Sequence, residues 1–252
     1  MARAAQWKSI TTKEIVGFER FQKMDLKVVD YLVQLNVMLF IGQFLQVFMG
    51  RISDAKKKLM DAVLELIWAG SYGNTTIDQI CEKAAVKKGS FYYFFDSKAD
   101  LAAAAFDANW QVRRGQLDSI FSSTVPPLER LQKYCDYNYG FQKEIKERFG
   151  MVLGCPLFAM GAEVCTKEDS LRKKVLEILD YKRKYLESAV RDAHASGAIC
   201  APDPEAQARM ILAYYEGLLT QARIQNDVEL LREMARGIFA MLGVKENQPI
   251  AA

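Results

Sequence analysis

The chain is poor in the residues on which several classes of protein and site depend. Its 252 residues include six prolines and 15 glycines, too few for a collagenous or low-complexity chain. A single histidine, His194, leaves little from which to build a multi-histidine metal site or a Ser-His-Asp triad. The sequence therefore predicts a folded protein with neither a metal nor another cofactor.

The cysteines are few and unsuitably spaced for a scaffold or a zinc site. Their number is odd, their spacings are wide, and no C-x-x-C pair occurs. A secreted disulfide framework is therefore not expected, and the simplest interpretation is a reducing cytoplasm. We expect most of these thiols to fill the core as small apolar side chains. They are Cys81, Cys135, Cys155, Cys165 and Cys200.

Charge of one sign is not in large excess either. The chain has 34 basic and 31 acidic residues, a formal net charge of +3. By itself this is too little to indicate a polyanionic partner. Half of the residues are hydrophobic and 26% are charged, which is the composition of a globular protein. The length fits one large domain or two small ones.

Residues 31–50, YLVQLNVMLFIGQFLQVFMG, contain no charged side chain. As a helix this segment would be about 30 Å long, close to the thickness of a bilayer core. Against a membrane span, four Asn and Gln side chains and Gly42 are scattered through it. A signal peptide fits badly because acidic residues precede the segment. Three interpretations stay open: a natural start at Met49, an additional packed helix, and a membrane span.

The hydrophobic pattern after residue 50 is helical throughout. Apolar residues recur at helical spacing, and no run alternates long enough to predict a strand. Thr76 and Ser97 are expected to open helices, and Pro127 fits a first helical turn. We therefore predict an all-α protein of about nine helices. Its parts are an N-terminal extension (1–48), a three-helix domain (49–98), a larger helical domain (99–243) and a tail (244–252).

Residues 76–98, TIDQICEKAAVKKGSFYYFFDSK, carry the most informative pattern. Two short helices joined by a tight turn give the helix-turn-helix layout, in which the second helix enters the DNA major groove. Phe91, Phe94 and Phe95 share one helix face and are expected to close the core. Lysine, serine and tyrosine side chains remain on the outer side, where they suit phosphate groups. The alternative is that the lysines are merely solvated and the aromatic residues form a packed corner.

From Arg51 to about Leu101 the chain resembles the TetR family of bacterial one-component repressors. The resemblance rests on the ungapped segment TIDQICEKAAVKKGSFYYFFDSKADL, which matches the family's signature from its capping threonine to its final leucine. Three positions depart from that signature. Cys81 replaces an alanine, and Phe94 replaces a tyrosine or histidine, so one phosphate hydrogen bond is expected to be absent. Ala85 replaces the turn glycine, so a strained or altered turn is expected there.

The resemblance implies a nine-helix fold, a homodimer, and a C-terminal domain that binds a small molecule and dimerises. It further implies that the threonine caps its helix against a phosphate and that the start of the second helix lies nearest the bases. The two tyrosines and the last lysine would then contact the DNA backbone. The DNA-binding residues expected on this basis are Thr76, Lys87, Lys88, Gly89, Ser90, Tyr92, Tyr93 and Lys98.

A weaker resemblance extends to the segment GCPLFAMGAEV (residues 154–164), which is similar to a pocket-lining segment of one TetR subgroup. Aromatic residues and methionine would suit a small, largely apolar or aromatic effector. Each of these residues could equally be an ordinary core residue. The pocket residues expected on this basis are Tyr134, Tyr139, Cys155, Phe158 and Met160.

The segment 208–222 is apolar over much of its circumference, which is typical of a helix buried on two sides. Together with the final helix it resembles the four-helix dimer interface of the TetR family. Ala213 and Gly217 would permit close approach. The residues expected at the interface are Met210, Tyr214, Leu218, Leu219, Leu231, Ile238 and Phe239.

The predicted function is a ligand-responsive DNA-binding transcriptional regulator, with a small-molecule effector that releases a repressor from a palindromic operator. An enzyme is not expected, because no Gly-rich phosphate loop, H-E-x-x-H motif or nucleophile elbow is present. No catalytic residue is therefore assigned. Two alternatives stay open: a regulator tethered to the membrane through residues 31–50, and a helical-bundle enzyme or small-molecule-binding protein.

Overall fold

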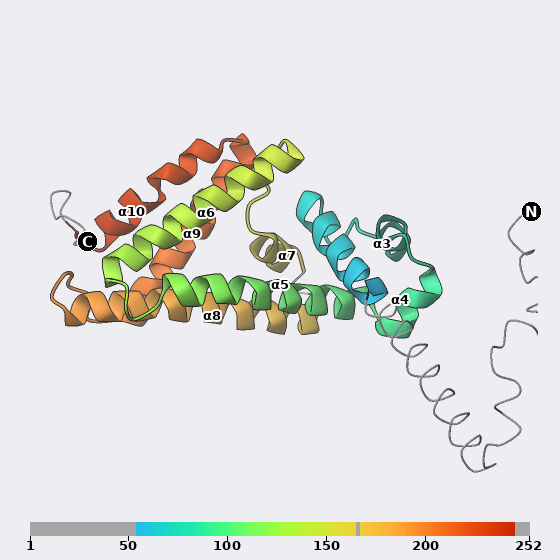
Figure 1. The fold of residues 1–252 in the computed structure, drawn as a ribbon, viewed down its shortest axis with the longest axis horizontal. Coiled ribbons are helices and arrows are strands. Elements are labelled where there is room, and N and C mark those ends of the chain that lie inside the picture. Colours follow the sequence, from blue (N-terminus) through green and yellow to red (C-terminus); the bar gives the residue numbers. More distant parts are fainter. Residues whose placement is uncertain (1–53, 165–166, 245–252) are drawn as a thin grey trace, which may run out of the picture. The chain divides into compact units, whose positions relative to one another are not determined.

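The structure is a computed structural model that describes residues 54–164 and 167–244. Within these residues every regular element is a helix (Figure 1), which confirms the all-α prediction. The charge-free segment 31–50 and Met49 lie outside the described residues. Among the helices that are described, none combines the length and the apolarity that crossing a bilayer requires.

Nine α-helices and one 3-10 helix make up the described part of the chain, in agreement with the predicted number. The described residues from Ala55 onward belong to one compact unit. The elements are a first helix over 54–69, α3 (Ile77–Ala84), α4 (Lys88–Phe94), α5 (Lys98–Ile120), α6 (Pro127–Phe149), α7 (Pro156–Val164), α8 (Asp169–Ala195), α9 (Pro204–Gln225), η1 (Val228–Arg232) and α10 (Glu233–Met241).

The predicted helix starts are confirmed in atomic detail. The Thr76 hydroxyl accepts a hydrogen bond from the Gln79 N–H (3.2 Å), and the Gln79 side chain accepts one from the Thr76 N–H (2.8 Å). This reciprocal pair is a complete capping box. Ser97 accepts from the Asp100 N–H at the start of α5, and Pro127 occupies the first turn of α6. Local sequence therefore fixes where these helices begin.

The first helix, α3 and α4 enclose a small core of their own. Phe91 is fully buried there with Leu59, Val63 and Ile80. Phe95 is also buried, as predicted, whereas Phe94 is only half-buried. Phe94 is the last residue of α4, so part of its ring passes the edge of the core and remains in contact with water.

Ala85 adopts the left-handed conformation that is expected at this position, where the TetR signature has a glycine. It follows α3 with φ 53° and ψ 43°, and its N–H closes the helix on the carbonyl of Glu82 (3.0 Å). A residue with a Cβ atom pays about 1–2 kcal/mol for this conformation. The turn of the helix-turn-helix unit is therefore built at some cost to stability.

Replacing Ala85 with glycine should stabilise the protein by about 1 kcal/mol, because glycine removes the Cβ strain but adds freedom to the unfolded chain. Urea unfolding of the two proteins measures the difference. Ala84→Gly is the matched control: Ala84 lies in the last turn of α3, so the same change there should destabilise by a similar amount. Equal destabilisation by both changes would contradict the strain at Ala85.

The remaining helices form a bundle beside the three-helix unit. In Figure 1 the long helices α5 and α8 run alongside each other, and α6 and α9 lie against them. The last helix, α10, packs on α6 and α9. The short helix α7 packs on α8 on the side of the three-helix unit. His194 lies in the last turn of α8, as predicted, where its exposed ring accepts a hydrogen bond from the Ala201 N–H (3.3 Å).

Candidate nucleic-acid interface and small-molecule pocket

The outer surface of α4 carries most of the predicted DNA-binding residues. Tyr92 and Tyr93 are 54% and 70% exposed, which is unusual for such large aromatic side chains. Lys87 and Gly89 are exposed at the start of the helix, and Ser90 is half-buried. A Cβ atom added to Gly89 would touch nothing, so the backbone there is open to a partner. The fully buried Phe91 anchors this surface to the core.

Lys88 is exposed but already paired. Its Nζ lies 2.7 Å from Oδ1 of Asp78 on α3, and this hydrogen bond raises the pKa of Lys88. Both side chains are well exposed, so water screens the pair and the ammonium can be exchanged at little cost. A DNA base or phosphate would therefore compete with a single carboxylate for Lys88.

Lys98 differs from the expected phosphate contact. Its Nζ donates to the carbonyls of Tyr72 (2.8 Å) and Thr75 (2.7 Å) and lies 4.1 Å from the centre of the Tyr72 ring. Burial lowers the pKa of Lys98, although Glu163 and Glu168 raise it in part. Two of its three N–H donors thus hold the loop that precedes α3. Lys98 therefore links α5 to the loop before α3 within the protein, and one of its N–H groups remains free to donate to a phosphate.

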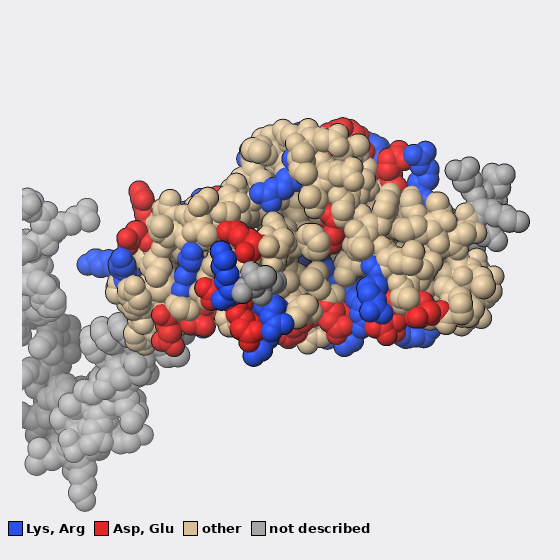
Figure 2. Space-filling model, turned by 180° about the vertical axis from the view of Figure 1, so that it is seen from behind, with Lys and Arg blue, Asp and Glu red and all other residues tan. Residues whose placement is uncertain are grey.

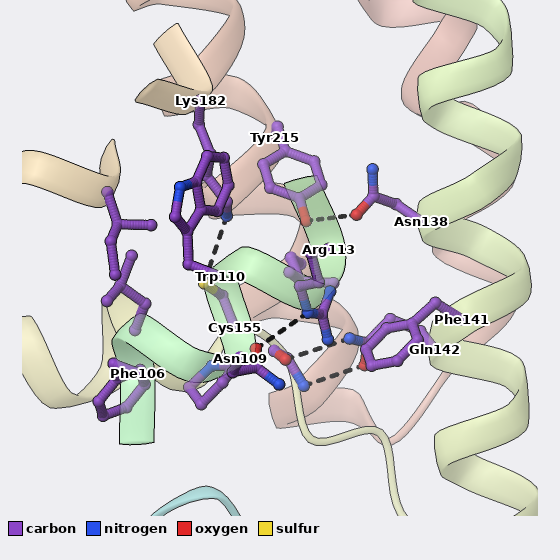
Figure 3. Close-up of a pocket in the computed structure, with 15 residues that line it drawn as sticks. Phe106, Asn109, Trp110, Arg113, Asn138, Phe141, Gln142, Cys155, Lys182 and Tyr215 are labelled. Carbon is purple, nitrogen blue, oxygen red and sulfur yellow. Dashed lines mark hydrogen bonds between the residues drawn. The ribbon is translucent and has the colours of Figure 1, made fainter. Parts of the chain in front are cut away.

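A pocket opens inside the helical bundle, with about 490 Å³ of empty space including its mouth. It lies between α5, α6, α8 and α9 and the segment that precedes α7 (Figure 3). Apolar side chains form most of its wall, as is usual for small-molecule sites. The apolar residues of the lining are Phe106, Trp110, Phe141, Pro156, Leu157, Ile178 and Leu219. The other lining residues are Asn109, Arg113, Asn138, Gln142, Gly154, Cys155, Lys182 and Tyr215.

Of the five residues expected in the pocket, Cys155 lines it. Tyr134 lies one layer behind, with its ring 5.4 Å from that of Tyr215. Tyr139 instead donates to Glu229 at 3.1 Å on the outside of α6. Phe158 is 42% exposed, and Met160 is 1% exposed within the core. Phe158 and Met160 do not line the pocket because only the first turn of α7 reaches it, and Tyr139 lies on a face of α6 that points away from it.

Two amide side chains of the lining are locked in place by the protein. Gln142 donates to the carbonyl of Gly154 and accepts from its N–H, both at 3.1 Å. Asn138 donates to the carbonyl of Tyr134 (2.7 Å) and accepts from the Tyr215 hydroxyl (2.8 Å). These bonds fix one wall of the pocket before any ligand enters.

Lys182 and Glu216 form an ion pair at the opposite wall. The two groups are 3.1 Å apart, with side chains 15% and 2% exposed, and Lys182 Nζ lies 3.7 Å from Cys155 Sγ. Burial lowers the pKa of Lys182, but the neighbouring Glu216 carboxylate offsets this, so the ammonium stays charged. Burial raises the pKa of Cys155 above its ordinary value, so its thiol stays neutral at pH 7.

Sequence reasoning missed the polar residues of this site. Glu216 offered a signal, because it is a carboxylate within a helix that is apolar around much of its circumference. Such a group needs a buried cation as a partner. Arg113 lies three residues after Trp110 and seven after Phe106, on one helix face, but this spacing alone says nothing of a pocket. The position of Lys182 gave no signal.

Trp68 connects the first helix to the pocket. Its indole Nε1 donates to the carbonyls of Leu153 (3.1 Å) and Gly154 (3.0 Å), and its ring stacks on Phe141 with centroids 5.6 Å apart. Arg113 lies over the same Phe141 ring at 4.1 Å. The pocket wall and the three-helix unit are therefore joined by direct contacts, at the backbone of Leu153 and Gly154 and at the ring of Phe141.

Glu163 makes a second connection, at the far end of α7. Its carboxylate accepts from the N–H groups of Tyr72 (2.9 Å) and Gly73 (2.6 Å), in the loop before α3. A Cβ atom at Gly73 would lie 2.6 Å from Glu163 Oε1, so with any other residue at this position the carboxylate would have to shift. The segment that runs from Cys155 to Glu163 thus touches the pocket at one end and the helix-turn-helix unit at the other.

The predicted dimer residues separate into two groups. Leu219, Leu231 and Ile238 are at most 1% exposed, so they fill the core of this chain and cannot meet a partner. Met210 is exposed, and Tyr214, Leu218 and Phe239 are half-buried. Figure 2 shows a broad area without charged residues on the side where α9 and α10 lie.

Two family models match the chain. The model described as "Bacterial regulatory proteins, tetR family" matches residues 59–105, which include the helix-turn-helix unit. The model described as "Tetracyclin repressor-like, C-terminal domain" matches residues 127–238, which include most of the pocket wall. Together they span the described core of the chain from its first helix to α10.

Relatives of known designation agree with these models. The chain is 28% identical to the transcriptional regulator AcuR of Cereibacter sphaeroides, over 73% of this chain and 83% of the relative. It is 24% identical to the repressor DhaR of a Mycobacterium species, over 77% of this chain and 96% of the relative.

Among solved structures, the regulatory protein TetR from Rhodobacter sphaeroides is similar, with a TM-score of 0.66 and 28% identity over 74% of this chain and 98% of that one. The reduced form of NemR from Escherichia coli shares the fold, with a TM-score of 0.66 and 20% identity over 76% of this chain and 100% of that one.

Proposed function

The chain belongs to the TetR family of bacterial regulatory proteins, and we propose that its α4 surface binds a palindromic operator from which an effector in the pocket releases it. Members of this family are ligand-responsive DNA-binding transcription factors, so the protein is a regulator and not an enzyme. The observation that carries the proposal is the exposed edge of α4, placed on a rigid core that two contacts join to the pocket.

Each of the two predicted domains has its own function. Residues 49–98 bind DNA, and residues 99–243 bind the effector and the partner subunit. The designation of the relative DhaR as a repressor supports repression as the mode of action. A regulator of this kind acts on the chromosome, in the cytoplasm.

As a homodimer the protein presents two α4 helices to successive major grooves, about 34–36 Å apart. The uncharged surface of α9 and α10 supplies the two-fold contact. Four of the predicted residues contribute to it: Met210, Tyr214, Leu218 and Phe239. An effector that favours a different separation of the two α4 helices lowers operator affinity, and by linkage DNA lowers effector affinity equally.

Binding of the full-length protein to DNA from the region upstream of its gene tests this proposal. Footprinting should show a protected palindrome at salt concentrations below physiological. Absence of any protected palindrome would contradict operator binding.

Lys88→Ala should lower operator affinity by about tenfold and affinity for random duplex much less, because Lys88 is nearest the bases. Fluorescence anisotropy with both duplexes measures the two affinities. Lys133→Ala is the control: it removes one equally exposed positive charge from α6, away from α4. An equal loss for both duplexes would show instead that Lys88 contacts phosphate only.

A further inference from the structure

The side chains that face the pocket differ in whether their hydrogen-bonding groups are already used. The acceptor oxygens of Asn138 and Gln142 each accept a hydrogen bond from the protein. The Asn109 oxygen likewise accepts from Arg113 Nε at 3.1 Å. The donors are less completely used, since only Nε of the Arg113 guanidinium has a hydrogen-bond partner among the described residues.

The charged side chains around the pocket also leave a positive group available to a ligand. Lys182 is neutralised by Glu216, whereas no carboxylate of the described residues lies within ion-pair distance of Arg113. The Arg113 side chain is half-buried against the face of Phe141, so its charge is neither paired nor fully hydrated. The pocket therefore holds one positive charge in excess, beside an apolar wall.

From these observations we propose that the effector is a small carboxylate with an apolar or aromatic body, and that Arg113 binds its carboxylate. The inference rests on the proposed function, because it names the ligand class of the same pocket. A guanidinium presents two parallel N–H donors that match the two oxygens of a carboxylate. Phe106, Trp110 and Leu157 line the same pocket and provide apolar surface for the body of the ligand (Figure 3).

A monoanion fits this site better than a dianion such as a phosphate monoester. One excess positive charge balances one carboxylate, and a second negative charge would stay buried without a partner. The same arginine packs on Phe141, which stacks on Trp68 of the first helix. A carboxylate that draws Arg113 from this ring therefore acts on the stack that holds the helix-turn-helix unit.

Matched pairs of a carboxylate and its amide test the ligand class on the full-length protein. Benzoate and butyrate, each beside benzamide and butyramide, are titrated by calorimetry and by thermal shift. We expect at least one carboxylate to bind at least about tenfold more tightly than its amide, because the amide lacks the charge that Arg113 needs. Amides that bind as well as the carboxylates, or no saturable binding by any probe up to about 10 mM, would overturn the proposal.

Arg113→Met should lower the affinity for the carboxylate at least about tenfold and leave that for the amide unchanged. Arg114→Met is the matched control, because Arg114 is the next residue but pairs with Asp118 on the outside of α5. Arg113→Lys keeps the charge without the planar fork and should bind with intermediate affinity, which guards against a folding defect. Unchanged carboxylate affinity in Arg113→Met would overturn the assignment.

The ligand class and the proposed function can fail separately. Operator affinity of the wild-type protein is measured with and without a saturating carboxylate. Carboxylate binding that leaves operator affinity unchanged supports the ligand class and contradicts effector control. Loss of operator affinity with an amide but not with a carboxylate supports effector control and overturns the ligand class.

Discussion

Glu216→Ala is expected to destabilise the folded protein by about 3–5 kcal/mol, the largest effect of any single change considered. The substitution leaves the Lys182 ammonium inside the bundle without its carboxylate. Lys182 is 15% exposed, too little for water to replace the lost partner. Urea unfolding monitored by circular dichroism measures the loss as a lower midpoint.

Two further variants separate the charge from the packing at this position. Lys182→Met combined with Glu216→Leu removes both charges and should restore most of the stability, because apolar residues of similar size replace a buried pair well. Glu205→Ala removes an exposed carboxylate from the same helix and should change stability by less than about 1 kcal/mol. A loss in Glu216→Ala no larger than that in Glu205→Ala would contradict the buried pair.

Glu163→Ala should uncouple the pocket from DNA while the fold stays intact. In the wild-type protein, an effector typically changes operator affinity by about 5–150-fold. Without Glu163 the N–H groups of Tyr72 and Gly73 lose the acceptor that α7 supplies, so this ratio should move toward one and retain only what the Trp68 contact transmits. The measurement is operator affinity by anisotropy, with and without a saturating ligand of the pocket.

A direct readout of the same contact needs no effector. The amides of Tyr72 and Gly73 should exchange with deuterium faster in Glu163→Ala, because each loses its only acceptor among the described residues. Glu147→Ala, an exposed carboxylate on α6, is the control and should change neither exchange nor coupling. Unaltered coupling in Glu163→Ala would leave the Trp68 contact as the sole route.

Several features of this protein could be predicted because they depend on neighbours in the sequence. A capping box at Thr76 and Gln79 involves residues three apart, and Ala85 must take a left-handed conformation wherever the turn needs one. Helical periodicity likewise identified Phe91 as a core residue. The all-α fold and the exposed edge of α4 follow from the same local rules.

Periodicity also has a limit that the dimer prediction illustrates. Helical periodicity shows that one face of a helix is buried, but it does not show whether that face packs within the chain or against a second subunit. Leu219, Leu231 and Ile238 have the pattern of an interface, yet they pack within the chain itself. Met160 and Phe158 are similar: both lie in an apolar segment, and only the orientation of α7 decides that neither reaches the pocket.

The sequence alone determined that this chain is helical, where its helices begin, and which short helix carries the exposed lysine and tyrosine side chains, since those properties arise from interactions within a few residues. The tertiary structure decided the rest. Lys98 turns inward to carbonyls more than 20 residues away, and Lys182 meets Glu216 across 34 positions of sequence. Partners at such separation are selected by the packing of whole helices, which no local pattern specifies.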